Sequence, residues 1–263
     1  MTKALLLTFS ILLFLPNLFT IDIFPFAKYN NREKYNPKLL YINTIKKLEE
    51  HIDSIAAKKK LSKDSFDYVK TITETITYRF YHGFSHFLLN ENWMAAVTGK
   101  LIKEDHACKV QPEAIIKHSY AACSQQEIVM MSIIRKNRIP YRAVLFPHHY
   151  AIEVFVENKW FYFDPNRDPE ITKDQRMETS WNHHSDTLKQ YYDTILFKDL
   201  NYIFGVGLTA INSPVNEIPA PNARLFQATT KILSKTLWIL PLLFFFFYPA
   251  ISFRSLKKSH NKL

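Results

Sequence analysis

Two short β-like runs joined by a two-residue turn constrain the fold of this chain more than any other feature. His149–Val156 alternates in character, Lys159–Asp164 follows it, and Glu157-Asn158 separates the two. Such a pattern predicts a β-hairpin. A further β-like run, Tyr141–Phe146, comes directly before them. The sequence therefore predicts a small antiparallel sheet.

Helical patterns occupy the chain ahead of these strands. Apolar residues recur every three or four positions in Leu39–Ala57 and again from Phe66 to Phe80, and Asp64 is placed to cap the second helix. Trp93–Ile102 and Ser124–Arg138 predict two more helices. Helices followed by antiparallel strands indicate an α+β fold.

The charge of the chain is unevenly distributed. The net charge of +10 suggests a nucleic-acid partner, but residues 224–263 hold seven basic residues and no acidic one. The rest of the chain is nearly neutral. This distribution is typical of membrane topology rather than of a basic groove, so no nucleic-acid partner is predicted. With only 4 glycines, a fold built on glycine-rich phosphate loops is excluded as well.

Both ends of the chain are apolar. Residues 1–27, with Ala4–Leu15 after Lys3, predict either a cleaved signal peptide or an uncleaved signal anchor, and the sequence leaves both open. Thr236–Phe253 contains eighteen uncharged residues, which predicts a transmembrane helix over 232–253.

These ends predict a topology for the whole chain. A Pro-containing linker over 211–231 leads to the transmembrane helix, and the basic tail 254–263 is expected in the cytoplasm. The domain between the apolar ends, residues 28–210, is then expected on the extracytoplasmic side of the membrane, either periplasmic or external. The membrane itself is an expected partner, through the C-terminal helix and, in the signal-anchor case, through the N-terminal segment.

Three residues of this domain have the chemistry of a nucleophilic site. Cys123 lies at the predicted start of a helix, where free N–H groups and the helix dipole stabilise a thiolate. His149 begins one strand of the hairpin and Asp164 ends the other, so both lie at the same end of the sheet. The carboxylate can then orient the imidazole. Bringing Cys123 to His149 requires its helix to pack on the sheet, which spacing alone does not determine.

Three segments carry a resemblance to a known family. Arg135–Arg142 is similar to an R-x-x-G-I-P-x-R run, His149–Val154 to H-x-W-x-E-V, and Trp160–Pro165 to W-x-x-x-D-P. In this order they resemble the transglutaminase-like core, a branch of the papain-like cysteine hydrolases and transferases. The resemblance is close over residues 113–166.

The resemblance implies a catalytic triad and a class of reaction. Cys123 would be the nucleophile, His149 the base and Asp164 the orienting acid, in hydrolysis or transfer at a protein or peptide amide. The backbone N–H of Cys123 is expected to bind the oxyanion, with the indole of Trp93 as candidate second donor. No cofactor and no metal are expected. The alternative is a non-catalytic transglutaminase-like module that binds proteins or envelope polymers, and residues 170–225 are a candidate extension covering the site.

Several assignments have competitors in the sequence. His148 competes with His149, and Asp168 competes with Asp164, although the motif register favours the latter of each pair. A disulfide between Cys108 and Cys123 is an open alternative to a free thiol. Two further groups are expected to be ordinary surface residues, namely the pair His106 and Cys108 and the pair His183-His184.

Overall fold

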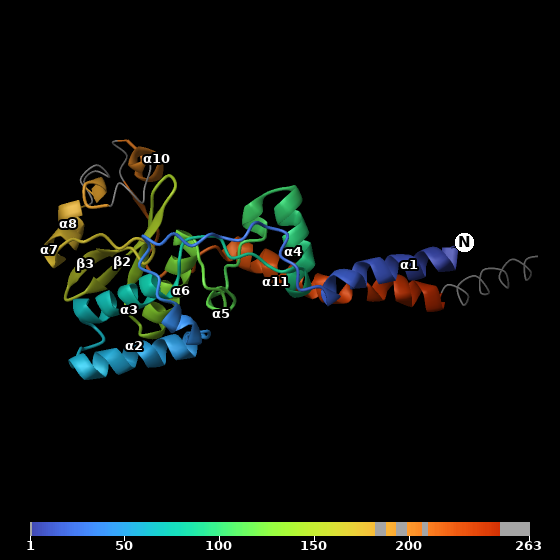
Figure 1. Cartoon of the computed structure of the whole chain (residues 1–263), viewed down its shortest axis with the longest axis horizontal. Coiled ribbons are helices and arrows are strands. Elements are labelled where there is room, and N and C mark those ends of the chain that lie inside the picture. Colours follow the sequence, from blue (N-terminus) through green and yellow to red (C-terminus); the bar gives the residue numbers. More distant parts are fainter. Residues whose placement is uncertain (1, 182–187, 193–198, 207–209, 248–263) are drawn as a thin grey trace, which may run out of the picture. The chain divides into compact units, whose positions relative to one another are not determined.

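The computed structural model describes residues 2–181, 188–192, 199–206 and 210–247 of the chain (Figure 1). These residues form two compact units. Unit 1 combines Met1–Pro25, His86–Cys108 and Pro221–Leu263, and unit 2 combines Phe26–Ser85 and Lys109–Ala220. Each unit is therefore assembled from separate stretches of the sequence.

Unit 2 is an α+β domain, as the sequence predicted. Its sheet has four antiparallel strands in the order β3-β2-β1-β4. The strands are β1 Tyr141–Leu145, β2 Tyr150–Val156, β3 Lys159–Phe163 and β4 Ile211–Asn212. The helices are η2 Pro37–Tyr41, α2 Ile45–Lys59, α3 Phe66–Arg79, α5 Pro112–Ile115, α6 Cys123–Lys136, α7 Lys173–Arg176, α8 Glu178–Trp181 and α10 Leu200–Phe204.

The predicted hairpin is confirmed as β2 and β3. Glu157 and Asn158 have φ values of 50° and 61°, and two consecutive positive φ angles are typical of the tight turn that matches strand twist. Ile152 pairs with Phe163 across the ladder. His149 and Asp164 therefore lie just outside the two strand ends, diagonally adjacent, because Asp164 is one position beyond Phe163.

Both faces of the sheet are covered. On one face, Phe66 of α3 packs on Phe161 and Phe163, and α6 contacts β1 and β2. Since successive strand residues point to opposite faces, Tyr162 lies on the other. That face is covered by a buried cluster made of Val144, Phe146, Ala151, Tyr162, Trp181, Leu188, Tyr192 and Phe204. The cluster extends to the end of the sheet where His149 and Asp164 lie.

Two helix starts differ from the prediction. The helix expected from Leu39 begins only at Ile45, because the side chain of Thr44 accepts a hydrogen bond from the Lys47 N–H and caps it there. The second helix is capped by Ser65, whose hydroxyl accepts from the Tyr68 N–H, 3.2 Å away. Asp64 instead accepts a hydrogen bond from the Ser62 side chain. Apolar periodicity identified both helices but not their caps.

Arg79, at the end of α3, is a buried cation that binds two separate loops. It is 1% exposed, and its guanidinium donates to the carbonyls of Ile42, Ile116 and His118 at 2.8–3.0 Å. The planar fork of arginine matches several acceptors at once, which an ammonium group cannot do.

Replacing Arg79 by lysine is therefore expected to lower the free energy of unfolding by about 2–4 kcal/mol, because buried carbonyls lose their donors. Urea denaturation of the variant measures this loss. Arg135→Lys is the matched control, since Arg135 is exposed at the end of α6. An equal, small effect of both substitutions would contradict the role given to Arg79.

Unit 1 is helical over its described residues. Its elements are α1 Thr2–Phe14, η1 Leu15–Leu18, α4 Leu89–Leu101, η3 Glu104–His106, α11 Pro221–Thr236 and a further helix, Ile239–Phe247. Residues 211–231 do not form the predicted linker. Ile211 and Asn212 form β4, and the residues from Pro221 onward belong to α11. Prolines at the first turn of a helix are well tolerated, which explains why Pro221 starts α11 rather than a linker.

The predicted transmembrane helix has a bend near its start. Within the described residues, no single helix combines the length and the apolar composition needed to cross a membrane. The pair formed by α11 and Ile239–Phe247 meets both requirements jointly, with a bend of 41° between them. Residues 248–253 of the predicted helix and the tail 254–263 lie outside the described residues.

Candidate active site

The start of α6 is built so that Cys123 is its first residue. Ala122 precedes it in an extended conformation, and the Gln125 side chain accepts a hydrogen bond from the Ala122 N–H at 3.2 Å. A glutamine three positions after the cap residue commonly makes this contact. The same amide also accepts from the Ser85 N–H and donates to the carbonyls of Ser85 and Lys109, each at 2.9 Å. Gln125 thus fixes the position of the helix start.

The first turn of α6, which begins at Cys123, contains free backbone donors. Among the described residues, the N–H groups of Cys123 and Ser124 have no acceptor, whereas those of Gln125 and Gln126 bond to the Ala122 carbonyl. Unpaired N–H groups and the helix dipole both favour negative charge at this position. The site can therefore stabilise a thiolate, or an oxyanion formed next to it.

His149 and Asp164 form a buried hydrogen-bonded pair. The His149 Nε2 lies 2.6 Å from the Asp164 Oδ2, and the two residues are 2% and 0% exposed. Asp164 accepts three further hydrogen bonds, from the Tyr192 hydroxyl at 2.6 Å and from the N–H groups of Asn166 and Arg167 at 2.9 and 3.0 Å. A buried carboxylate with this many donors can keep its charge.

The electrostatics of the pair favour an imidazolium. Burial works against the charged form of His149, but the charge and hydrogen bond of Asp164 and the hydrogen bond of Cys123 outweigh it and raise the pKa of His149 to about 10. Burial likewise opposes the charge of Asp164, yet His149 and the other donors lower its pKa. Because Nε2 faces Asp164, Nδ1 is the ring nitrogen left for the Cys123 thiol.

Aromatic side chains enclose the imidazole of His149. The rings of Phe204, Phe146 and Tyr192 lie 5.3, 6.3 and 6.3 Å from it. Two of these, Tyr192 and Phe204, come from the segment 170–225, so these two residues of the candidate extension pack against His149. Tyr192 also hydrogen bonds to the Tyr162 hydroxyl at 2.6 Å, which holds it in place.

The two competitors of the pair have other partners. His148 stacks on Tyr202 at 3.8 Å, and its N–H donates to the Ile203 carbonyl. Asp168 is paired with Arg176 at 2.8 Å and with Lys70. The structure therefore brings together His149, Asp164 and Cys123, the residues that the motif register favoured.

Glu127 is a site residue that sequence reasoning missed. It lies one helical turn after Cys123, it is buried, and its Oε1 has no hydrogen-bond partner within the described residues. Burial, and then the proximity of the Cys123 thiolate, raise the pKa of Glu127 well above its ordinary range. The four-residue spacing from Cys123 within a predicted helix was the available signal, because such residues share a helix face.

Replacing Glu127 by glutamine is expected to stabilise the protein more at pH 8 than at pH 5. The folded state keeps a proton on Glu127 that the unfolded state releases above the ordinary pKa of 4.5. The free energy of unfolding of the wild type therefore falls as the pH rises above that value. Glutamine is neutral throughout, and the variant avoids that loss. Urea denaturation of both proteins at the two pH values measures the difference, and a pH-independent difference would contradict this protonation of Glu127.

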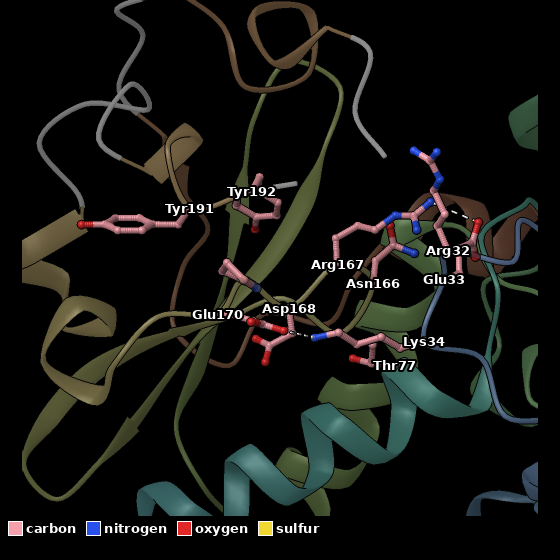
Figure 2. A pocket seen from close by; sticks show the side chains of 11 residues that line it. Arg32, Glu33, Lys34, Thr77, Asn166, Arg167, Asp168, Glu170, Tyr191 and Tyr192 are labelled. Atoms are coloured by element: carbon pink, nitrogen blue, oxygen red, sulfur yellow. Dashed lines mark hydrogen bonds and ion pairs between the residues drawn. The ribbon is translucent and has the colours of Figure 1, made fainter. Parts of the chain in front are cut away.

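A cavity of about 360 Å³ adjoins the carboxylate side of the pair (Figure 2). Tyr192, Asn166 and Arg167, which all donate to Asp164, also line it. The ion pairs Arg167–Glu33 and Lys34–Glu170 flank it. The full lining is Arg32, Glu33, Lys34, Thr77, Asn166, Arg167, Asp168, Pro169, Glu170, Tyr191 and Tyr192. No sequence pattern predicted this cavity, because its walls come from four distant segments of the chain.

The remaining candidates have different surroundings. Trp93 lies in α4 of unit 1, where its indole N–H donates to the Ser234 carbonyl at 3.0 Å. An indole has one N–H, so this bond uses the donor that the oxyanion role requires, and the structure does not support Trp93 in that role. Cys108 and Cys123 are both free thiols, which excludes the disulfide. His183 and His184 lie outside the described residues.

The arrangement has the parts that acyl transfer needs. A thiol at a helix start, an imidazole held by a buried carboxylate and free N–H donors lie together in unit 2. Within the described residues, no group of three or more His, Cys, Asp or Glu side chains is placed to hold a metal ion. Comparisons with protein-family models, curated proteins and solved structures found no match to this chain.

Proposed function

We propose that unit 2 is a thiol-dependent amide hydrolase or acyltransferase of the transglutaminase-like type. Cys123 is the nucleophile, His149 the general base and acid, and Asp164 the residue that orients the imidazole. The observation that carries the proposal is the 2.6 Å bond between His149 and Asp164, with the Cys123 thiol hydrogen bonded to the same ring. Nucleophile, base and orienting acid in this order are the recurring pattern of such enzymes.

The first half of the reaction forms a thioester. The Cys123 thiolate attacks the carbonyl carbon of an amide, and a C–S bond forms while the carbonyl oxygen becomes an oxyanion. In the proposed reaction the N–H groups of Cys123 and Ser124, which have no acceptor among the described residues, bind this oxyanion. The C–N bond then breaks, and the imidazolium of His149 gives its proton to the departing amine.

The second half regenerates the thiol. Water, or a second amine, attacks the thioester while His149 accepts its proton, and the C–S bond breaks. Water yields a carboxylic acid and an amine yields a new amide, so the same residues serve hydrolysis and transfer. Asp164 keeps the imidazole oriented and stabilises its positive charge in both halves.

The substrate class follows from the proposed chemistry and the cavity. A protein or peptide amide is the proposed substrate, and the cavity beside Asp164, with both cationic and acidic walls, suits a polar side chain or chain end of such a molecule. The proposed location is a membrane, with unit 2 on the extracytoplasmic face. The basic residues after the apolar C-terminal stretch support that orientation.

A turnover assay tests the proposal. Purified full-length protein is incubated with a glutamine-containing peptide library and a fluorescent primary amine, and products are identified by mass spectrometry. Deamidated, cleaved or amine-linked peptides are expected with the wild type and not with Cys123→Ala. Equal products from both proteins would overturn the assignment. Peptide binding without turnover, unchanged by Cys123→Ala, would favour the non-catalytic binding module instead.

A further inference from the structure

Polar side chains of the N-terminal segment bind the backbone of the C-terminal apolar segment within unit 1. The Ser10 hydroxyl donates to the Trp238 carbonyl at 2.6 Å, and the Asn17 amide donates to the Ser234 carbonyl at 2.9 Å. Lys235 returns a hydrogen bond to the Asn17 side chain at 2.9 Å. Ser10 is buried although the rest of its helix is mostly apolar.

The carbonyls that accept these bonds lie close to the bend between Thr236 and Ile239. The Leu240 N–H bonds to the Leu237 carbonyl, three residues earlier, and Pro241 has no N–H to donate. Helix bends of this kind leave carbonyls without intrahelical donors, and side chains of a neighbouring helix can replace them. Ser10 and Asn17 supply donors on either side of the bend.

The pairing continues along the whole N-terminal helix. Phe14 packs edge-on against Trp238 with ring centroids 5.1 Å apart, and the Lys3 ammonium lies 5.7 Å from the Phe245 ring centroid. Lys3, Ser10 and Asn17 are spaced by seven residues, so they share one helix face. The two helices run antiparallel side by side (Figure 1).

The outer surface of this hairpin is apolar. Its exposed side chains include Leu5, Phe9, Leu12, Leu240, Phe244 and Phe246, with Leu5 69% exposed. No charged residue occurs between Lys3 and Asp22 or between Lys235 and Arg254. Lys3 lies in the first turn of α1, and four basic residues without an acidic one follow the second helix in sequence, which suits anionic lipid headgroups.

We propose that residues 1–18 are retained in the mature protein and pair with Ile239–Phe247 as a helical hairpin inserted in a lipid bilayer. A signal peptide that is removed needs no specific contacts with the rest of the chain, whereas Ser10 and Asn17 donate hydrogen bonds to carbonyls of the C-terminal segment. The helix Lys3–Leu18 spans roughly 24 Å at 1.5 Å per residue, which fits insertion into a hydrocarbon core roughly 30 Å thick. The inference does not depend on the chemistry of Cys123.

Two measurements on the full chain test the proposal. The mass of the protein purified from bacterial membranes is expected to include residues 1–25, and a mature chain that begins after them would overturn it. The protein is also expected to float with vesicles of phosphatidylcholine and phosphatidylglycerol. A detergent-free dimer that stays in the soluble fraction would show that a second copy, rather than lipid, covers the apolar surface.

Cross-linking tests the pairing itself. In a background with Cys108→Ala and Cys123→Ala, the double variant Phe14→Cys and Trp238→Cys is expected to cross-link with a short bismaleimide in membranes. The matched control is Leu5→Cys with Trp238→Cys, because Leu5 lies on the exposed surface, about two and a half helical turns from Phe14. Equal cross-linking of both pairs would contradict the hairpin register.

Discussion

Iodoacetamide is expected to alkylate Cys123 in the native protein at about pH 7 roughly 100-fold faster than Cys108. The two thiols are almost equally buried, at 8% and 7% exposure, so access alone predicts similar rates. Their electrostatics differ. Burial, and then the neighbouring Glu104 and Asp105, raise the pKa of Cys108 far above its ordinary range. Cys123 instead lies at the start of α6 beside His149, and a helix start and an imidazolium both favour a negative charge next to them.

Site-resolved mass spectrometry after timed alkylation measures both rates in one sample. Cys108→Ala is expected to leave the labelling of Cys123 unchanged, and Cys123→Ala to remove the fast phase. In urea, where the environments are lost, the two thiols are expected to react alike. Equal rates in the native protein would show that Cys123 is an ordinary buried thiol.

Replacing Asp164 by asparagine is expected to reduce turnover by about 10³- to 10⁴-fold, as loss of the orienting acid does in other triads. Asparagine keeps the shape of the side chain but removes the charge that raises the pKa of His149 to about 10. The imidazolium then loses its proton at lower pH. Because the thiolate depends on that positive charge, alkylation of Cys123 is expected to slow most at and below about pH 7, where an ordinary thiol is almost entirely protonated, and the difference is expected to shrink towards about pH 9.

The alkylation rate of Cys123 as a function of pH separates this effect from a loss of folding. The wild type is expected to keep a high rate across neutral pH, and Asp164→Asn to approach the profile of an ordinary thiol. Asp174→Asn, an exposed acid in α7, serves as the matched control. Identical profiles for wild type and Asp164→Asn would contradict the proposed thiolate–imidazolium pair.

The sequence predicted that His149 and Asp164 lie together at one end of the sheet, because their relative position depends only on the hairpin between them. The alternation of β2 and β3 and their two-residue turn determine where His149 and Asp164 lie relative to each other. The helix of Cys123 was equally evident, from its apolar spacing and from Pro140. Its contact with the imidazole was expected from resemblance alone, since it depends on how α6 packs on β1 and β2.

Features built from distant segments could not be predicted in this way. Arg79 binds carbonyls from two separate loops, and the cavity beside Asp164 is lined by residues from four parts of the chain. Trp93 is a candidate oxyanion donor by resemblance alone, because the second donor in such folds often comes from an upstream side chain. In the structure its helix, α4, belongs to unit 1 with α11.

The contacts of Gln125 bear on how the chain tolerates change. Ser85 and Lys109 are the last and first residues of unit 2 on either side of the stretch 86–108, and the Lys109 N–H bonds to the Ser85 carbonyl at 2.9 Å. Gln125, two residues after Cys123 in α6, bonds to both residues. Hydrogen bonds therefore hold the two ends of residues 86–108 next to each other. An insertion with closed ends can vary in length and sequence without displacing the domain that carries it, so α6 is insulated from variation in residues 86–108.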